Sequence, residues 1–162
     1  MQKLLLSAKD LVKLSLAGIP HPGYISPDAM VTAISAMTRL KSLRLEFHTF
    51  LSRPDPGRQL SAPLTRTVLP ALTTLTFQGI HEYSESLMAQ IDAPLLEGLF
   101  VSFIKSTDLT VGVPQLYRFV SQTEAFKTHG RAQVSGSCQE IVCALFQRTD
   151  PVEYSRQLSL KM

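Results

Sequence analysis

Leucine residues recur in the same short frame four times along this chain, and other side chains alternate with them. Each frame follows the pattern LxxLxL, in which phenylalanine or valine replaces the last leucine in two of the copies. The frames are Leu11, Leu14 and Leu16; Leu40, Leu43 and Leu45; Leu72, Leu75 and Phe77; and Leu96, Leu99 and Val101. Their middle leucines are about 29, 32 and 24 residues apart, at or somewhat beyond the period of about 20 to 29 residues that is typical of leucine-rich repeats. The pattern predicts four parallel strands in one sheet, with a degraded fifth copy around Ala132 and Val134.

The alternation inside each frame predicts which side chains share a face of this sheet. Successive side chains of a strand point to opposite faces, so the leucines point to one side and the residues between them to the other. The second face is mostly polar, and Phe100 places a large apolar ring within it. Its predicted members are Lys13, Ser15, Ser42, Arg44, Glu46, Thr74, Thr76, Gln78, Phe100 and Ser102.

Helices are expected between the strands, because a parallel pair needs a long connection that is usually helical. Ser26 is placed to cap a helix with Pro27 at its first position, and apolar residues follow at helical spacing. That stripe consists of Met30, Val31, Ile34 and Met37. Ser84 is expected to cap a second helix over Glu85 to Ile91, and a third helix is expected to begin at Pro114. The first two should pack on the leucine face of the sheet.

The remaining segments are predicted from their turn residues. Ser52 to Pro63 contains three prolines and is expected to be a surface loop. Two β-rich runs, Arg131 to Val134 and Gln139 to Phe146, flank a turn at Ser135 to Cys138 and predict a β-hairpin. The elements together predict one α/β domain over residues 1–162. Its expected architecture is an irregular leucine-rich repeat solenoid, with parallel strands on one face, helices on the other, and a C-terminal β-hairpin.

Composition narrows the class of protein. Apolar residues make up 44% of the chain and charged residues 18%, which argues against disorder. No apolar run approaches the roughly 18 residues of a membrane helix, so no membrane partner is expected. Lys9, Asp10 and Lys13 interrupt the leucine-rich start, so no secretory signal is expected either. Cys138 and Cys143 form no disulfide framework and fit an intracellular, reducing setting of unspecified compartment.

The charge distribution argues against a nucleic-acid partner. The formal net charge is +3, and the basic residues are dispersed along the sequence. Arg39, Lys41 and Arg44 form the closest cluster, but Glu46 follows at once and no aromatic residues interleave to stack on bases. A solvated face is the simpler interpretation.

No constellation of residues that carries out catalysis is recognisable. Cys138 and Cys143 do not have the CxxC spacing of zinc or redox motifs. The histidines do not pair at helical spacing; they are His21, His48, His81 and His129. Neither GxSxG nor a phosphate-binding glycine motif occurs. We therefore expect no enzymatic activity, no cofactor and no metal.

Several longer phrases carry a resemblance to a known family. They are the LxxLxL frames, SPDAMVTAISAMTRLKSL, LPALTTLTFQGIHEYSESLMAQIDAPLLE and VPQLYRFVSQTEAFK. Together, from about Lys13 to the end, they resemble the leucine-rich repeat region of the F-box-like proteins of mushroom-forming (basidiomycete) fungi. The resemblance implies that the repeats hold a substrate while an F-box binds the adaptor of a cullin-type ubiquitin ligase. A repeat follows Met1 almost at once, so we expect this chain to lack the F-box and not to bind the adaptor.

The expected function is non-catalytic protein binding, resembling the substrate-binding part of an F-box ubiquitin-ligase receptor. The concave strand face is the predicted contact surface. Its predicted contact residues are Arg44, Glu46, Thr74, Thr76, Gln78 and Phe100. Two alternatives stay open: a truncated F-box-like fragment with no independent function, suggested by termini that lack polar capping units, and a small hydrolase.

Overall fold

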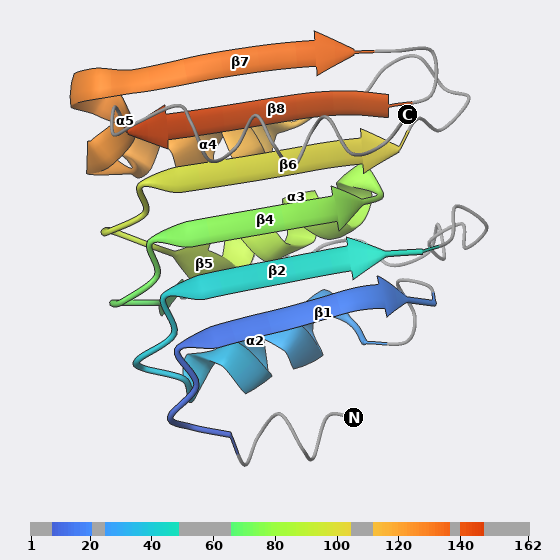
Figure 1. The fold of residues 1–162 in the computed structure, drawn as a ribbon, viewed down its shortest axis with the longest axis vertical. Coiled ribbons are helices and arrows are strands. Elements are labelled where there is room, and N and C mark those ends of the chain that lie inside the picture. The colour runs from blue at the N-terminus through green and yellow to red at the C-terminus, as the bar shows by residue number, and fades with distance from the viewer. Residues whose placement is uncertain (1–7, 21–24, 49–65, 105–111, 137–139, 148–162) are drawn as a thin grey trace.

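The structure is a computed structural model that describes residues 8–20, 25–48, 66–104, 112–136 and 140–147. In chain order its elements are β1 (Lys13–Ile19), α2 (Pro27–Ser35), β2 (Ser42–Phe47), β3 (Thr67–Val68), β4 (Thr74–Gly79), α3 (His81–Gln90), β5 (Ile91–Asp92), β6 (Gly98–Ile104), α4 (Pro114–Gln122), α5 (Glu124–His129), β7 (Gly130–Gly136) and β8 (Glu140–Gln147). A six-stranded sheet has the order β1-β2-β4-β6-β8-β7, and β3 pairs with β5 in a second, two-stranded sheet. The chain is thus a mixed α/β protein with a mostly parallel main sheet (Figure 1).

The leucine frames lie side by side in this sheet. Leu14 is the register partner of Leu43, Leu43 of Leu75, and Leu75 of Leu99, all in parallel pairs. These four leucines are buried. The predicted parallel pairing of four strands in sequence order is therefore confirmed.

A tight turn precedes three of these strands and explains the first leucine of each frame. The backbone N–H of Leu40 donates to Met37 at 3.0 Å, that of Leu72 to Leu69 at 3.3 Å, and that of Leu96 to Ala93 at 3.2 Å. Proline occupies the second position of the latter two turns, where its fixed φ suits a β-turn. We name these three turns the strand-leading turns.

The backbone just before each strand repeats as well. The carbonyl of Val12 accepts from the N–H groups of Lys41 and Ser42, and the carbonyl of Lys41 accepts from those of Thr73 and Thr74. The carbonyl of Thr73 then accepts from the N–H groups of the equivalent pair in the next unit, Glu97 and Gly98. Each unit is therefore joined to the next in the same way, three times in succession.

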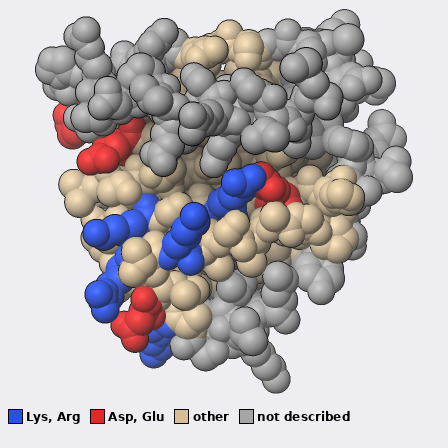
Figure 2. Space-filling view, viewed as in Figure 1, with Lys and Arg blue, Asp and Glu red and all other residues tan. Residues whose placement is uncertain are grey.

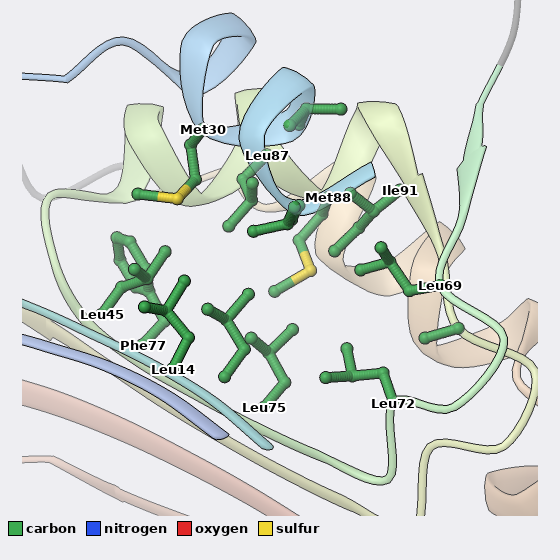
Figure 3. Packing of buried hydrophobic residues seen from close by; sticks show 14 of the residues in the cluster. Leu14, Met30, Leu45, Leu69, Leu72, Leu75, Phe77, Leu87, Met88 and Ile91 are labelled. Carbon is green, nitrogen blue, oxygen red and sulfur yellow. The ribbon is translucent and has the colours of Figure 1, made fainter. Parts of the chain in front are cut away.

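Helices α2, α3 and α4 lie on one side of the sheet, behind it in Figure 1. Ser26 caps α2, because its hydroxyl accepts the N–H of Ala29 at 3.2 Å, and Pro27 begins the helix as predicted. In Figure 3, Leu75 and Phe77 of the sheet point toward Met30, Leu87 and Met88 of the helices. The leucine face of the sheet and the apolar stripes of the helices therefore form the core.

Helix α3 begins earlier than expected. The prediction that Ser84 caps a helix over Glu85 to Ile91 is wrong, because α3 starts at His81 and Ser84 is buried inside it. The ring of Tyr83 packs 4.6 Å from that of Phe47 and 5.9 Å from that of Phe77, measured between ring centroids. Burying this ring requires the helix to start directly after β4, so tertiary packing overrides the local capping preference of serine.

Replacing Tyr83 by phenylalanine should leave stability at neutral pH unchanged or raise it by about 1 kcal/mol, because the buried hydroxyl has no hydrogen-bond partner among the described residues. Burial, and to a smaller extent Asp28, raises the pKa of Tyr83 above its ordinary value. The folded chain thus favours the neutral phenol, so this contribution to stability is present below about pH 10 and is lost as the pH rises further.

Urea unfolding of both proteins at about pH 8 and about pH 11 checks this pH dependence. The wild type should lose more free energy of unfolding between the two pH values than the phenylalanine variant. Equal losses would show that the Tyr83 phenol is not shielded from solvent.

The C-terminal hairpin is confirmed, but its place in the sheet was not foreseen. Strand β8 pairs antiparallel with both β6 and β7 and lies between them, so β7 forms the sheet edge. The degraded fifth copy therefore does not pair with the fourth frame. On the helix side, β8 offers Ile141 and Leu145, which pack against the core, whereas Val134 of β7 is 71% exposed.

Several predicted features lie outside the described residues. These are the loop from Ser52 to Pro63, Cys138, and the C-terminal RQLSLKM. Among the helices that the structure describes, none has the length and apolar character needed to cross a membrane.

Candidate functional site

The candidate site is the face of the main sheet opposite α2, α3 and α4, which we call the open face. All six residues predicted for it lie there on neighbouring strands, because Arg44, Thr76 and Phe100 are register partners across β2, β4 and β6. Glu46 and Gln78 form the next row, and Thr74 precedes Thr76 on the same side of β4. Each of the six is partly exposed. The residues come together because a parallel register stacks equivalent positions of successive units.

Arg44 and Glu46 form an ion pair within the open face. The Arg44 Nε donates to Oε1 of Glu46 at 2.9 Å, and the Nη2 group donates to the same oxygen. Two residues apart on one strand, the side chains project from the same side. The pair is partly exposed, with 42% of the Arg44 and 22% of the Glu46 side chain accessible, so its own contribution to stability is about 1 kcal/mol at most. The two hydrogen bonds hold the guanidinium in a defined position beside Glu46.

The open face is also more apolar than its sequence frames indicated. Strand β8 sets Ala144 opposite Phe100 and Phe146 opposite Gly98. Val142 lies opposite Ser102 in the next row. The alternation of EIVCALF signals that Val142, Ala144 and Phe146 share one face. Sequence reasoning missed them because it did not identify β6 as the neighbour of β8.

Basic residues gather at the opposite corner of the open face, over the start of β1 and β2 (Figure 2). Lys13 alternates with buried Leu14 and so lies on the open face, while Lys41 directly precedes β2. Lys9 lies in the turn before β1, and Arg39 lies in a strand-leading turn. These four exposed side chains, Lys9, Lys13, Arg39 and Lys41, are named the basic rim. The open face therefore changes from cationic at β1 to apolar at β6 and β8.

The thiol of Cys143 lies on the helix side of β8, because its register partner is buried Val101. It is a free, half-buried cysteine, and burial raises the pKa of the thiol. A raised pKa lowers the thiolate fraction at neutral pH. Among the described residues, no group of three or more His, Cys, Asp and Glu side chains is arranged to hold a metal ion. The open face offers hydrogen-bonding groups, cations and the partly exposed ring of Phe100.

Comparison of the chain with protein-family models, with curated proteins and with solved structures found no match.

Proposed function

We propose that this chain is a non-catalytic protein-binding module of the leucine-rich repeat type, and that its open face binds a segment of a partner protein. The single observation that carries the proposal is the register of the open face, which joins Arg44, Thr76 and Phe100 in one row across three strands. Parallel strands stacked in repeat proteins commonly present such extended binding surfaces.

The repeated backbone supports the repeat class. Three successive units share the strand-leading turn. In each of them, two consecutive backbone N–H groups also donate to one carbonyl, which belongs to the residue just before the neighbouring strand. Helices α2, α3 and α4 lie on one side of the sheet (Figure 1). The polar positions of β2 and β4 alternate with buried apolar residues and so face the other side. An irregular solenoid with units of unequal length is the architecture that this repetition favours.

The composition of the open face supports binding. Phe100 presents a partly exposed ring beside buried Ala144, and Arg44 lies one strand beyond Thr76 in the same row. Aromatic and arginine side chains are enriched among the residues that contribute most to protein interfaces. Thr74, Thr76 and Gln78 between them supply hydrogen-bonding groups.

Within this proposal the chain acts as the substrate-binding part of an F-box-like receptor inside the cell. The basis is the sequence resemblance of the frames and helix openings to the repeat region of those proteins. Recruitment of a ubiquitin ligase would then depend on an F-box, and the open face would select the substrate.

Replacing Arg44 and Phe100 together by alanine should weaken peptide binding by the open face. The probe is a phage-displayed library of random peptides selected on the immobilised wild-type chain. Peptides enriched by the wild type should bind the double variant at least about tenfold more weakly, since two central contacts are lost. The matched control replaces Arg118 and Tyr117 by alanine, an exposed arginine and an exposed aromatic ring on α4.

The control variant should retain affinity within about twofold. An equal loss in both variants, or unchanged binding by the open-face variant, would exclude this face as the binding surface. Failure of the wild-type chain to enrich any peptide would overturn the proposed function itself.

A further inference from the structure

The basic rim brings four exposed cationic side chains together on one surface. None of Lys9, Lys13, Arg39 and Lys41 forms an ion pair within the described part of the chain. Arg44, Arg66 and Lys127, in contrast, each bond to a protein acceptor. Unpaired like charges held on one surface attract a ligand of opposite charge.

The backbone brings two of these cations onto neighbouring strands, one position apart in register. The N–H of Lys41 donates to the carbonyl of Val12 at 2.8 Å, and Lys13 is the register partner of Ser42. Adjacent strands are about 4.8 Å apart, and Lys41 directly precedes the partner of Lys13, so the long side chains of both lysines can reach one ligand. Two neighbouring carboxylates on one peptide match this spacing.

We infer that the basic rim binds an acidic segment of the partner protein, and that the same segment places an apolar side chain against Phe100. The inference rests on the proposed function and specifies the chemistry of the partner. Carboxylates of the segment pair with Lys13 and Lys41, while the apolar residue lies over the partly exposed ring of Phe100.

The distance between the two contacts sets the spacing in the partner. Three strand intervals separate β1 from β6, and Phe100 lies two residues further along its strand than the row of Lys13. These offsets correspond to about 16 Å, which an extended peptide covers with about five residues. Between the two contacts, the row that begins at Lys13 continues with Ser42 and Thr74, whose side chains are small. The partner segment should therefore carry acidic residues about five positions from a large apolar one.

A polypeptide fits the basic rim better than a nucleic acid does. Asp10 adjoins Lys9 in the sequence, and Glu46 lies on the open face of β2, so acidic groups border the cations and would repel a continuous phosphate chain. On the open face of β1 and β2 the described side chains include no aromatic ring on which a base could stack. The cationic area is thus suited to a few discrete carboxylates.

Charge reversal tests the inference with a defined probe. The probe is a fluorescein-labelled synthetic peptide with two glutamates and, about five residues away, a leucine in a serine and glycine background. Fluorescence anisotropy should show that Lys13→Glu combined with Lys41→Glu weakens binding at least about tenfold. The control with the same change in charge is Arg118→Glu combined with Lys127→Glu on α4 and α5, which should change affinity less than about twofold.

Two further probes make the result decisive. A peptide with lysines in place of the glutamates should not bind, and a single-stranded oligodeoxythymidine of equal charge should bind more weakly than the acidic peptide. Tighter binding of the oligonucleotide, equal effects of the two charge-reversed variants, or no binding of the acidic peptide would overturn the inference. If the random library enriches peptides without acidic residues that still need Arg44 and Phe100, the proposed function stands and the acidic partner is excluded.

Discussion

Replacing Leu75 by alanine should lower the free energy of unfolding by about 3 to 4 kcal/mol, the largest effect expected of a single substitution in this chain. Leu75 is fully buried on β4, between Leu43 on one neighbouring strand and Leu99 on the other. In Figure 3 its side chain lies in the middle of the space between the sheet and the helices. Truncation removes apolar contacts and leaves a cavity that close-packed neighbours on both sides fill only in part.

Urea denaturation followed by far-ultraviolet circular dichroism measures this loss. The control is Thr76→Ala, one position further along the open side of the same strand and partly exposed, which should cost less than about 0.5 kcal/mol. Similar losses at the two positions would mean that the leucine face does not form the core.

Replacing Glu85 by alanine should cost about 3 kcal/mol, the second largest effect. The buried carboxylate of Glu85 on α3 accepts the N–H of Gln115 at 2.7 Å and that of Leu116 at 2.9 Å. Helix α4 has Val113 at its N-cap and no side-chain cap of its own, so Glu85 serves as its cap from the neighbouring helix. Alanine would leave these N–H groups without the acceptor that α3 supplies.

Thermal unfolding of three variants separates the contribution of the helix cap to stability from the general effect of removing a negative charge. Glu85→Gln keeps one acceptor oxygen and should lose less stability than Glu85→Ala. Glu82→Ala removes a partly exposed carboxylate from the same helix, next to His81, and should cost less than about 0.5 kcal/mol. Equal destabilisation by Glu82→Ala and Glu85→Ala would rule out a capping role.

Much of the main sheet follows from local pattern. The leucine spacing predicts β1, β2, β4 and β6 because one side of each strand is buried, which makes the alternation of apolar and polar residues strict. Ser26 and Pro27 predict the start of α2 because a cap and a first-turn proline act within a few residues. Arg44 and Phe100 were assigned to one face for the same reason.

The remaining features depend on contacts between residues far apart in the sequence. The start of α3 depends on the packing of Tyr83 on Phe47. The place of β8 depends on its pairing with β6, a strand about 40 residues earlier in the sequence. Arg66 donates to the carbonyls of Met88 and Ala89 near the end of α3, although nothing in its local sequence distinguishes it from a surface arginine. Such contacts have no periodic signature. The alternation in EIVCALF predicts that Val142, Ala144 and Phe146 share one face, but it does not predict that β6 lies beside them.

The helix layer contains side-chain contacts that hold neighbouring units together. Gln90 of α3 donates to the Asp28 carboxylate of α2 at 2.9 Å, and Glu85 of α3 caps α4. The open face therefore lies on a sheet whose opposite side is covered by linked helices. A rigid support of this kind lets a surface bind a partner with little loss of conformational entropy.

The most direct test of the open face as a binding surface is a backbone NMR titration of the labelled chain with a peptide selected from the random library. Binding there should shift the amide signals of Thr76, Phe100 and Ala144, which are register partners on three adjacent strands, and leave those of Tyr117 and Arg118 on α4 unchanged. Shifts confined to α4 and the other helices, with the three strand signals unmoved, would contradict the proposal.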